Sequence, residues 1–195
     1  MTVTYTNGKG RTYYLCRTET KTGAPWYFFA REPKGEPQDE IPEGYEIRES
    51  VNGLVSLAKQ RPVRILSSER EWVEALIQKH LKSHNYRVDV KEDAIVIYER
   101  AGADPEDLIG RLRGTLRIPS GRADAVREVL EEGARFSPEM RFVLLDEEDR
   151  TFGTERWCYL GSIDDWIEIG PRGPLRVLAK RFIPLLGTHR LHDIL

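Results

Sequence analysis

The chain has 195 residues, of which 30 are Lys or Arg and 32 are Asp or Glu, so its formal net charge is −2. A balance this close to neutral argues against the uniformly basic surface of a general nucleic-acid-binding protein and against an acidic tail. No apolar run approaches the roughly 18 residues that a membrane-spanning helix needs, and the polar start of the chain lacks the apolar stretch of a signal peptide.

The first third of the chain is predicted to form antiparallel β-sheet. Residues 12–18 and 25–31 are rich in β-branched and aromatic side chains, and the turn-forming residues between them indicate a hairpin. The charges here are unevenly spread, because residues 1–35 hold six basic and two acidic side chains, whereas residues 36–50 hold one basic and six acidic ones. A chain that is neutral as a whole can therefore still carry a local basic patch.

A second hairpin is predicted to follow. Residues 45–49 alternate with period two, residues 54–58 return, and Asn52-Gly53 between them favours the positive φ angles of a tight turn. The Pro- and Gly-rich stretch 32–44 is predicted to be a loop.

The middle of the chain changes to helical spacing. Residues 63–66 predict a short strand, and a helix is predicted to begin at Ser67 and Ser68 because Glu71 stands at the capping-box distance from Ser68. Apolar side chains then recur at steps of three and four as far as about Ser83.

Residues 86–90 and 94–98 predict another hairpin, which completes a β-α-β-β unit at the centre of the fold. The remaining predicted elements are a short helix at 106–112, a helix at 124–132, strands at 142–145, 151–160 and 166–169, and a helix from Pro174 that Pro184 ends. The predicted class is α+β, mostly antiparallel, with a C-terminal helix. We expect residues 1–60 to form a small antiparallel module of two hairpins and residues 61–195 an α+β domain, with one continuous domain as the alternative.

Several segments together resemble a family of bacterial proteins that carries no assigned activity. They are IPEGYEI at 41–47, Asn52-Gly53, YRVDV at 86–90, IVIYE at 95–99 and RWCYLGSIDDW at 156–166. The resemblance spans most of the chain and implies a bacterial origin but no mechanism.

The common motifs of nucleotide-binding and hydrolytic enzymes do not occur in the sequence. It holds no G-x-x-x-x-G-K-[ST], G-x-G-x-x-G, G-x-S-x-G or H-E-x-x-H. We therefore expect no cofactor, and we lean away from an enzyme.

Metal-ligating patterns are equally weak. Cys16 and Cys158 stand alone, which predicts neither a zinc site nor a disulfide framework and is typical of a reducing cytoplasm. His80 and His84 are four residues apart near the end of a predicted helix, a place where the helix dipole already favours histidine. No metal site is predicted.

Adjacent carboxylates, Asp164 and Asp165, lie near Arg156 in the segment richest in tryptophan. They could hold a divalent cation or supply an acid and a base. Successive residues of a strand point to opposite faces, so the pair can meet one ligand only within a turn. The alternative is a structural turn whose neighbours Trp157 and Trp166 fill the core.

The first hairpin is the best candidate for a binding surface. Its second strand is aromatic on both faces, with Trp26 on one and Tyr27 on the other. Three basic side chains lie nearby: Arg17, Lys21 and Arg31. Tryptophan, tyrosine and arginine are enriched at the centres of protein interfaces. The alternative is that these aromatic side chains are simply the core of a small module.

We therefore expect a non-catalytic binding or regulatory protein of the bacterial cytoplasm, which contacts a protein partner or a second copy of itself through these five residues. One alternative is a metal-dependent hydrolase or nuclease built around Asp164 and Asp165 with Arg156. Another is a single-strand nucleic-acid binder that stacks bases on Trp26 and Tyr27.

Overall fold

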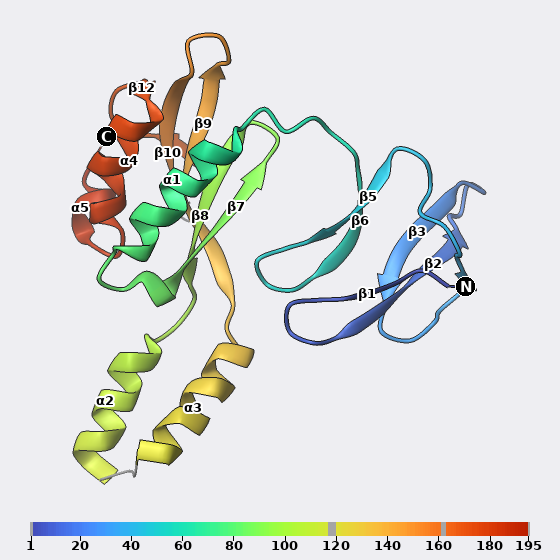
Figure 1. Ribbon diagram of the computed structural model, residues 1–195, viewed down its shortest axis with the longest axis horizontal. Coiled ribbons are helices and arrows are strands. Elements are labelled where there is room, and N and C mark those ends of the chain that lie inside the picture. Colours follow the sequence, from blue (N-terminus) through green and yellow to red (C-terminus); the bar gives the residue numbers. More distant parts are fainter. Residues whose placement is uncertain (1, 117–119, 161–162, 195) are drawn as a thin grey trace. The chain divides into compact units, whose positions relative to one another are not determined.

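The structure is a computed structural model that describes residues 2–116, 120–160 and 163–194. The chain divides into two compact units, Met1–Arg61 and Pro62–Leu195 (Figure 1). Each unit has its own strands and its own buried side chains, and each is described by itself below.

The first unit is made of antiparallel strands. They are β1 (Thr4–Thr6), β2 (Thr12–Glu19), β3 (Pro25–Ala30), β4 (Glu36–Pro37), β5 (Tyr45–Glu49) and β6 (Val55–Lys59). Strand β2 is central: it pairs with β3 along one edge and with β1 and then β4 along the other, whereas β5 and β6 form a separate pair. Both predicted hairpins are confirmed, and Tyr13, Leu15, Cys16 and Val55 form the buried apolar part of this unit.

The turn between β5 and β6 is a three-residue loop that contains the predicted Asn52-Gly53 pair. Ser50 N donates to Leu54 O, which leaves three residues in the loop, and Gly53 has a φ of 76°. This loop is contacted by the turn between β1 and β2, where Asn7 Nδ2 donates to Gly53 O over 2.6 Å. A Cβ at Gly53 would stand 3.0 Å from that nitrogen, so the close approach requires glycine.

The second unit is an antiparallel sheet with helices, which confirms the predicted α+β class. Its elements are α1 (Ser67–Gln78), η1 (Ser83–Asn85), β7 (Tyr86–Lys91), β8 (Ala94–Arg100), α2 (Pro105–Leu116), α3 (Ser120–Glu132), β9 (Phe136–Asp146), β10 (Thr151–Leu160), β11 (Ile163–Glu168), β12 (Gly173–Pro174), α4 (Leu175–Phe182), η2 (Ile183–Leu185) and α5 (His189–His192). The strand order is β11-β10-β9-β8-β7, and β12 pairs with the start of β10.

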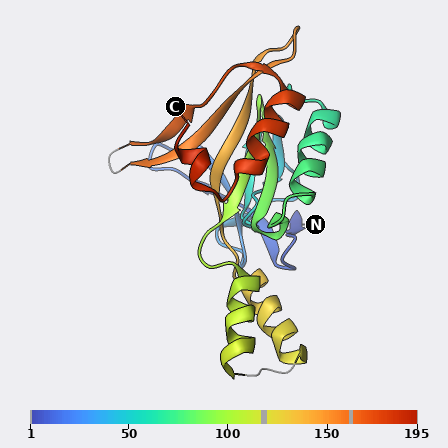
Figure 2. The same cartoon turned by 90° about the vertical axis from the view of Figure 1, so that its left-hand side faces the viewer.

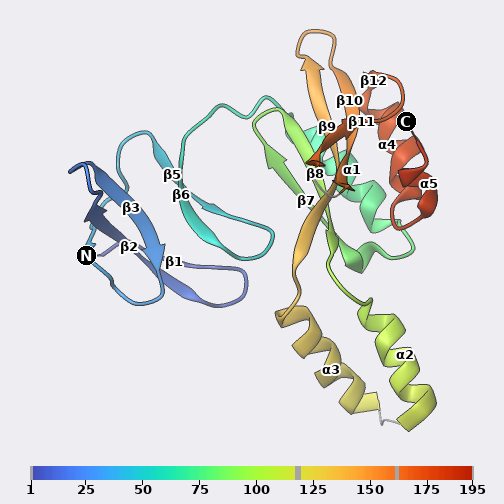
Figure 3. The ribbon, with the colours of Figure 1, turned by 180° about the vertical axis from the view of Figure 1, so that it is seen from behind.

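One face of this sheet carries α1, α4 and α5 (Figure 2). The side chains that alternate onto this face form the core with the inner sides of the helices, as in Ile95, Ile97, Met140, Phe142, Val73, Leu178 and Phe182. The opposite face carries none of the helices of the described second unit (Figure 3). None of the helices in the described ranges is long and apolar enough to cross a membrane.

The predicted β-α-β-β unit lacks its first strand. Residues 63–66 are not in a strand, although Arg64 N donates to Glu92 O over 2.7 Å. The helix that follows begins as predicted at Ser67, but its N-terminal hydrogen bond joins Leu66 N to Glu69 Oε2 (2.9 Å) rather than involving Ser68 and Glu71. It ends at Gln78, short of the predicted end near Ser83.

Helices α2 and α3 form a hairpin inserted between β8 and β9, and it extends beyond the ends of these strands (Figure 1). Both helices are longer than predicted from their spacing. Arg127 of α3 holds the two together, because its guanidinium donates to both carboxylate oxygens of Glu106 on α2.

Candidate functional site

The predicted binding surface centres on β3, whose sequence from Pro25 to Ala30 contains no charged side chain. Strand alternation places Trp26 on one face of the sheet and Tyr27 on the other. The indole of Trp26 is 58% exposed, whereas Tyr27 and the next three side chains are half-buried. Trp26 is therefore presented by a strand that the other aromatic residues hold in place.

The turn that precedes Trp26 is ordered by hydrogen bonds. Thr20 N donates to Ala24 O, and Ala24 N donates back to Thr20 Oγ1 over 3.1 Å. Gly23 has a φ of 79°, which is the left-handed conformation that such a turn requires. The exposed Lys21 thus lies in a fixed turn next to the tryptophan end of β3.

The structure does not bring all five predicted residues to one surface. Arg17 lies directly opposite Tyr27 in the register, on the face away from Trp26, and its Nη1 is 3.6 Å from Glu36 Oε2. Arg31 is exposed just after β3. Trp26 therefore lies on one face, Arg17 and Tyr27 on the other, and Lys21 and Arg31 outside the strands; of the five, only Trp26 combines high exposure with a large apolar surface.

The carboxylates of the hydrolase alternative are also separated. Asp164 and Asp165 lie in the strand β11 and not in a turn, so they point to opposite faces, opposite Tyr159 and Cys158 respectively. Arg156 lies on the buried face beside Met140, and Asp165 shares that face while Asp164 does not. The Gly161–Ser162 part of this segment lies outside the described residues.

The tryptophans of the same segment do not fill the core behind the helices. Trp157 and Trp166 face each other across β10 and β11 with their ring centres 5.1 Å apart, and both are half-buried on the face away from the helices. Arg141 covers Trp166, with its guanidinium carbon 4.3 Å from the ring centre, and donates to Glu155. Each ring of this surface cluster therefore already has an aromatic or cationic neighbour.

A polar row that no sequence pattern indicated crosses the buried face of the sheet at its end near α5. Tyr86 on β7 donates to Glu99 on β8 over 3.0 Å, and Glu139 on β9 is 3.5 Å from His192. Glu139 is the extra residue of a β-bulge, because the register passes from Pro138 to Met140 across one step of β8. Burial and the neighbouring Glu99 raise the pKa of Glu139 to about 7, against the opposite influence of Arg156.

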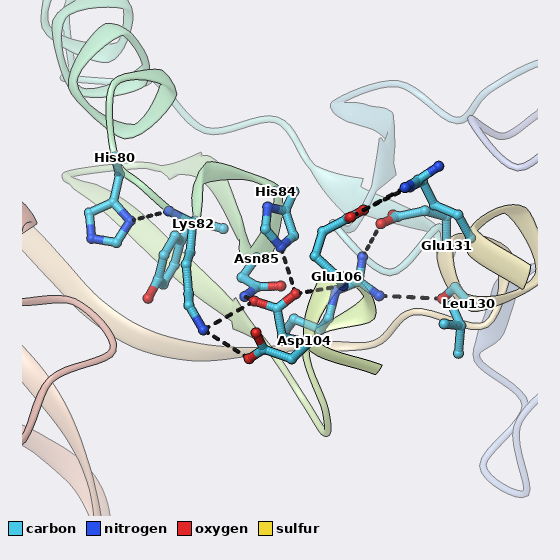
Figure 4. Close-up of polar contacts among 12 residues, drawn as sticks. His80, Lys82, His84, Asn85, Asp104, Glu106, Leu130 and Glu131 are labelled. Atoms are coloured by element: carbon cyan, nitrogen blue, oxygen red, sulfur yellow. Dashed lines mark hydrogen bonds and ion pairs between the residues drawn. The ribbon is translucent and has the colours of Figure 1, made fainter. Parts of the chain in front are cut away.

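The base of the α2–α3 hairpin holds a second polar cluster, centred on the buried carboxylate of Asp104 (Figure 4). His84 Nε2 lies 2.8 Å from its Oδ1, and Asn85 Nδ2 donates to its Oδ2 over 2.8 Å. Glu106 N, in the first turn of α2, donates to Oδ1 as well. Although burial opposes ionisation, the hydrogen bonds from His84 and Asn85 hold the pKa of Asp104 well below its usual range.

This Asp104 cluster caps and anchors a helix, and the carboxylate oxygens are already engaged by donors of the chain itself. Asp104 was not among the predicted site residues, although an aspartate directly before Pro105 is a sequence signal of a helix start. No group of three or more His, Cys, Asp or Glu side chains within the described ranges could hold a metal ion.

Comparisons of the chain with protein-family models, with curated proteins and with solved structures gave no match.

Proposed function

We propose that this protein is a binding protein whose first unit contacts a protein partner through a surface centred on Trp26. The observation that carries the proposal is the 58% exposure of this side chain on a strand with no charged residue. Indole buries a large area at little cost in conformational entropy, which is why tryptophan is frequent among the residues that dominate interface energies.

The charges around Trp26 favour a protein over a single-stranded nucleic acid. A site that stacks bases needs cations that follow the phosphate backbone. Here Arg17 is directed to Glu36 on the other face, and Glu19, which lies opposite Pro25, shares the face of Arg17 and not that of Trp26. Trp26 faces the uncharged Thr18 across the strands, and an exposed aromatic side chain with an uncharged neighbour fits the apolar centre of a protein interface better than a track for phosphates.

A photo-crosslinking experiment in cells of the source organism tests this proposal. Thr18 is exposed and lies directly opposite Trp26 in the register, so p-benzoylphenylalanine at position 18 samples whatever covers the indole. We expect a discrete protein adduct, and we expect Trp26→Ala to reduce its yield at least tenfold. Leu54→Ala is the matched control, because Leu54 is another exposed apolar side chain of the same unit (65% exposed).

An adduct of twice the mass of the chain would identify the partner as a second copy, which the proposal includes. Adducts with nucleic acid, or an adduct yield that Trp26→Ala and Leu54→Ala leave equally unchanged, would overturn the proposal.

A further inference from the structure

The second unit contains a groove between the end of α1 and the segment formed by α4 and η2. Its volume is about 370 Å³, within the range of small-molecule sites. Most of its lining is apolar and comes from both sides of the groove, with Leu76, Leu81, Ala179, Ile183 and Pro184. The groove belongs to the second unit alone.

Among the described residues, the only charged side chains that line this groove are two lysines, one from each side. Lys79 closes α1 and Lys180 belongs to α4, and both are exposed. Neither forms an ion pair with any residue in the described ranges, and Lys180 Nζ instead lies 5.7 Å from the centre of the Trp72 ring. Elsewhere in this unit cations are commonly neutralised, as in the pairs of Arg64 with Asp93 and Arg150 with Glu69.

The positive charge continues next to the groove. Arg176 and Arg181, also on α4, likewise pair with no carboxylate of the described chain and lie over the rings of Trp72 and Phe182 respectively. A groove with unpaired cations from two helices and no acidic side chain among its described lining attracts an anion.

The remaining polar side chain of the lining, His80, is held by contacts with its own segment. Its Nδ1 accepts a hydrogen bond from Lys82 N over 3.2 Å, and burial lowers its pKa below the ordinary value. Its ring packs edge-on against Tyr86, with the ring centres 5.0 Å apart. His80 therefore contributes to the groove a ring whose Nδ1 and edge are already engaged within the chain.

The apolar lining of the groove includes one side chain, Leu81, that the protein leaves uncovered. It is 94% exposed, in the chain just after α1, between two lysines at positions 79 and 82. A large aliphatic side chain in this position leaves apolar surface in water that a ligand can cover, at about 25 cal/mol for each Å² buried.

We propose that the groove between α1 and α4 binds an organic anion with an apolar body, its carboxylate or phosphate head held between Lys79 and Lys180 and its body packed on Leu76, Leu81 and Ile183. The size of the groove favours a small molecule over a folded partner domain. The lysines present flexible point charges and not the planar fork of arginine, which suits a head group of either geometry.

Calorimetric titration of the full chain with octanoate and with octyl phosphate tests the proposal. We expect both to bind with one site per chain, and we expect octylamine and inorganic phosphate to bind at least tenfold more weakly, because each lacks one half of the required chemistry. Phosphatidylglycerol vesicles form a separate arm, which distinguishes a lipid head group from a free amphiphile as the source of the anion.

Three variants locate the site. Lys79→Glu/Lys180→Glu should weaken octanoate binding at least tenfold, whereas Arg111→Glu, which reverses an exposed charge on α2, should leave it unchanged. Leu81→Ser removes only an exposed side chain, so it keeps the fold and should weaken octanoate without changing the response to inorganic phosphate.

Equal binding of octylamine and octanoate, or equal effects of the Arg111 and lysine variants, would overturn the proposal. Binding to vesicles without binding to the free anions would overturn it too and would assign the groove to a membrane surface. Trp26→Ala lies in the other unit and should leave octanoate binding unchanged, so the two proposals fail independently.

Discussion

Glu139 shows how a single residue departs from the pattern of its strand. The bulge in β9 inserts it between Pro138 and Met140, and the inserted carboxyl group is buried beside Glu99 and Arg156. A carboxyl group that is difficult to ionise in the folded protein makes stability depend on pH. Because the folded pKa is raised to about 7 from the ordinary 4.5, the folded state binds more protons than the unfolded state between these values. Stability therefore falls as the pH rises from about 4.5 to about 7 and stays reduced above that.

We predict that Glu139→Gln removes this dependence. The variant should gain up to about 3 kcal/mol in the free energy of unfolding at pH 8 relative to the original protein, and little at pH 4.5. Urea denaturation at both pH values measures the difference, and the lowered pKa of His80, whose effect has the opposite sign, is common to both proteins and cancels. Glu148→Gln, in the exposed turn after β9, is the control; a Glu139→Gln gain that is the same at both pH values would contradict the prediction.

Gly53 and Gly23 allow the effect of one side-chain contact to be separated from the effect of backbone conformation. Both have φ angles in the left-handed region, 76° and 79°, but a Cβ at Gly23 would meet nothing within 4 Å, whereas a Cβ at Gly53 would press on Asn7 Nδ2. We predict that alanine at either position costs about 1–2 kcal/mol for the backbone conformation alone, and that Gly53→Ala costs measurably more than Gly23→Ala. Thermal unfolding of the two variants compares them, and equal costs would show that the contact with Asn7 contributes nothing.

Among the elements, the α2–α3 hairpin depends most on a few polar contacts. It leaves the sheet between β8 and β9, and its base is fixed by Asp104 on one side and by Arg100 on the other. Arg100 Nη1 donates to Leu130 O over 3.3 Å, and its Nη2 bonds Glu131. Loss of either contact is expected to free the hairpin before it affects the sheet, because the strands are held by their own ladder and core.

We predict that Asp104→Asn increases amide hydrogen exchange in α2 and α3 while β8 and β9 stay protected. The carboxylate contributes stability that is present above its ordinary pKa of 3.8 and is lost only at lower pH, because its folded pKa is depressed. At neutral pH the substitution should therefore cost about 1–3 kcal/mol locally. Asp107→Asn removes only an exposed ion pair with Lys82 and should have a small effect; uniform exchange changes over the whole unit would contradict the anchoring role.

Most elements could be predicted because their signals are local. Strand-type segments bounded by turn residues predicted β2, β3, β5–β8 and β10. Apolar residues at steps of three and four predicted α1 and α4. Residues 63–66 have the composition of a strand, but pairing is a property of the neighbouring chain, and they meet the β7–β8 turn only through Arg64 N. The bulge at Glu139 is likewise a consequence of register, which no local spacing encodes. Asp164 and Asp165 are separated by strand alternation, because β11 spans Ile163–Glu168 and not only the predicted residues 166–169.

The same limit applies to the candidate sites. An aromatic strand can present its side chains to a partner or bury them as the core of its module. The packing of β3 decides between these outcomes and leaves Trp26 exposed. The groove was not visible in the sequence, because Lys79 and Lys180 lie far apart along the chain. The sequence does carry one signal that could have suggested it: from Arg172 to Arg190 the chain holds only basic charges.

At the scale of the whole molecule, the chain consists of two compact units with different surfaces. The first, Met1–Arg61, presents an exposed tryptophan on a small antiparallel module, and the second, Pro62–Leu195, has a basic and apolar groove beside its helices. We propose binding for both surfaces. The catalytic alternative based on Asp164, Asp165 and Arg156 is not favoured, because β11 directs the two carboxylates to opposite faces.

The central claim is that Trp26 contacts a protein, and crosslinking from position 18 tests it most directly. Because Trp26 is 58% exposed, Trp26→Ala should change the free energy of unfolding by less than about 0.5 kcal/mol, so a lost adduct reports on binding and not on folding. We predict a discrete protein adduct that Leu54→Ala retains and Trp26→Ala loses. An adduct that persists in the Trp26→Ala chain, or one that contains nucleic acid, would contradict this claim.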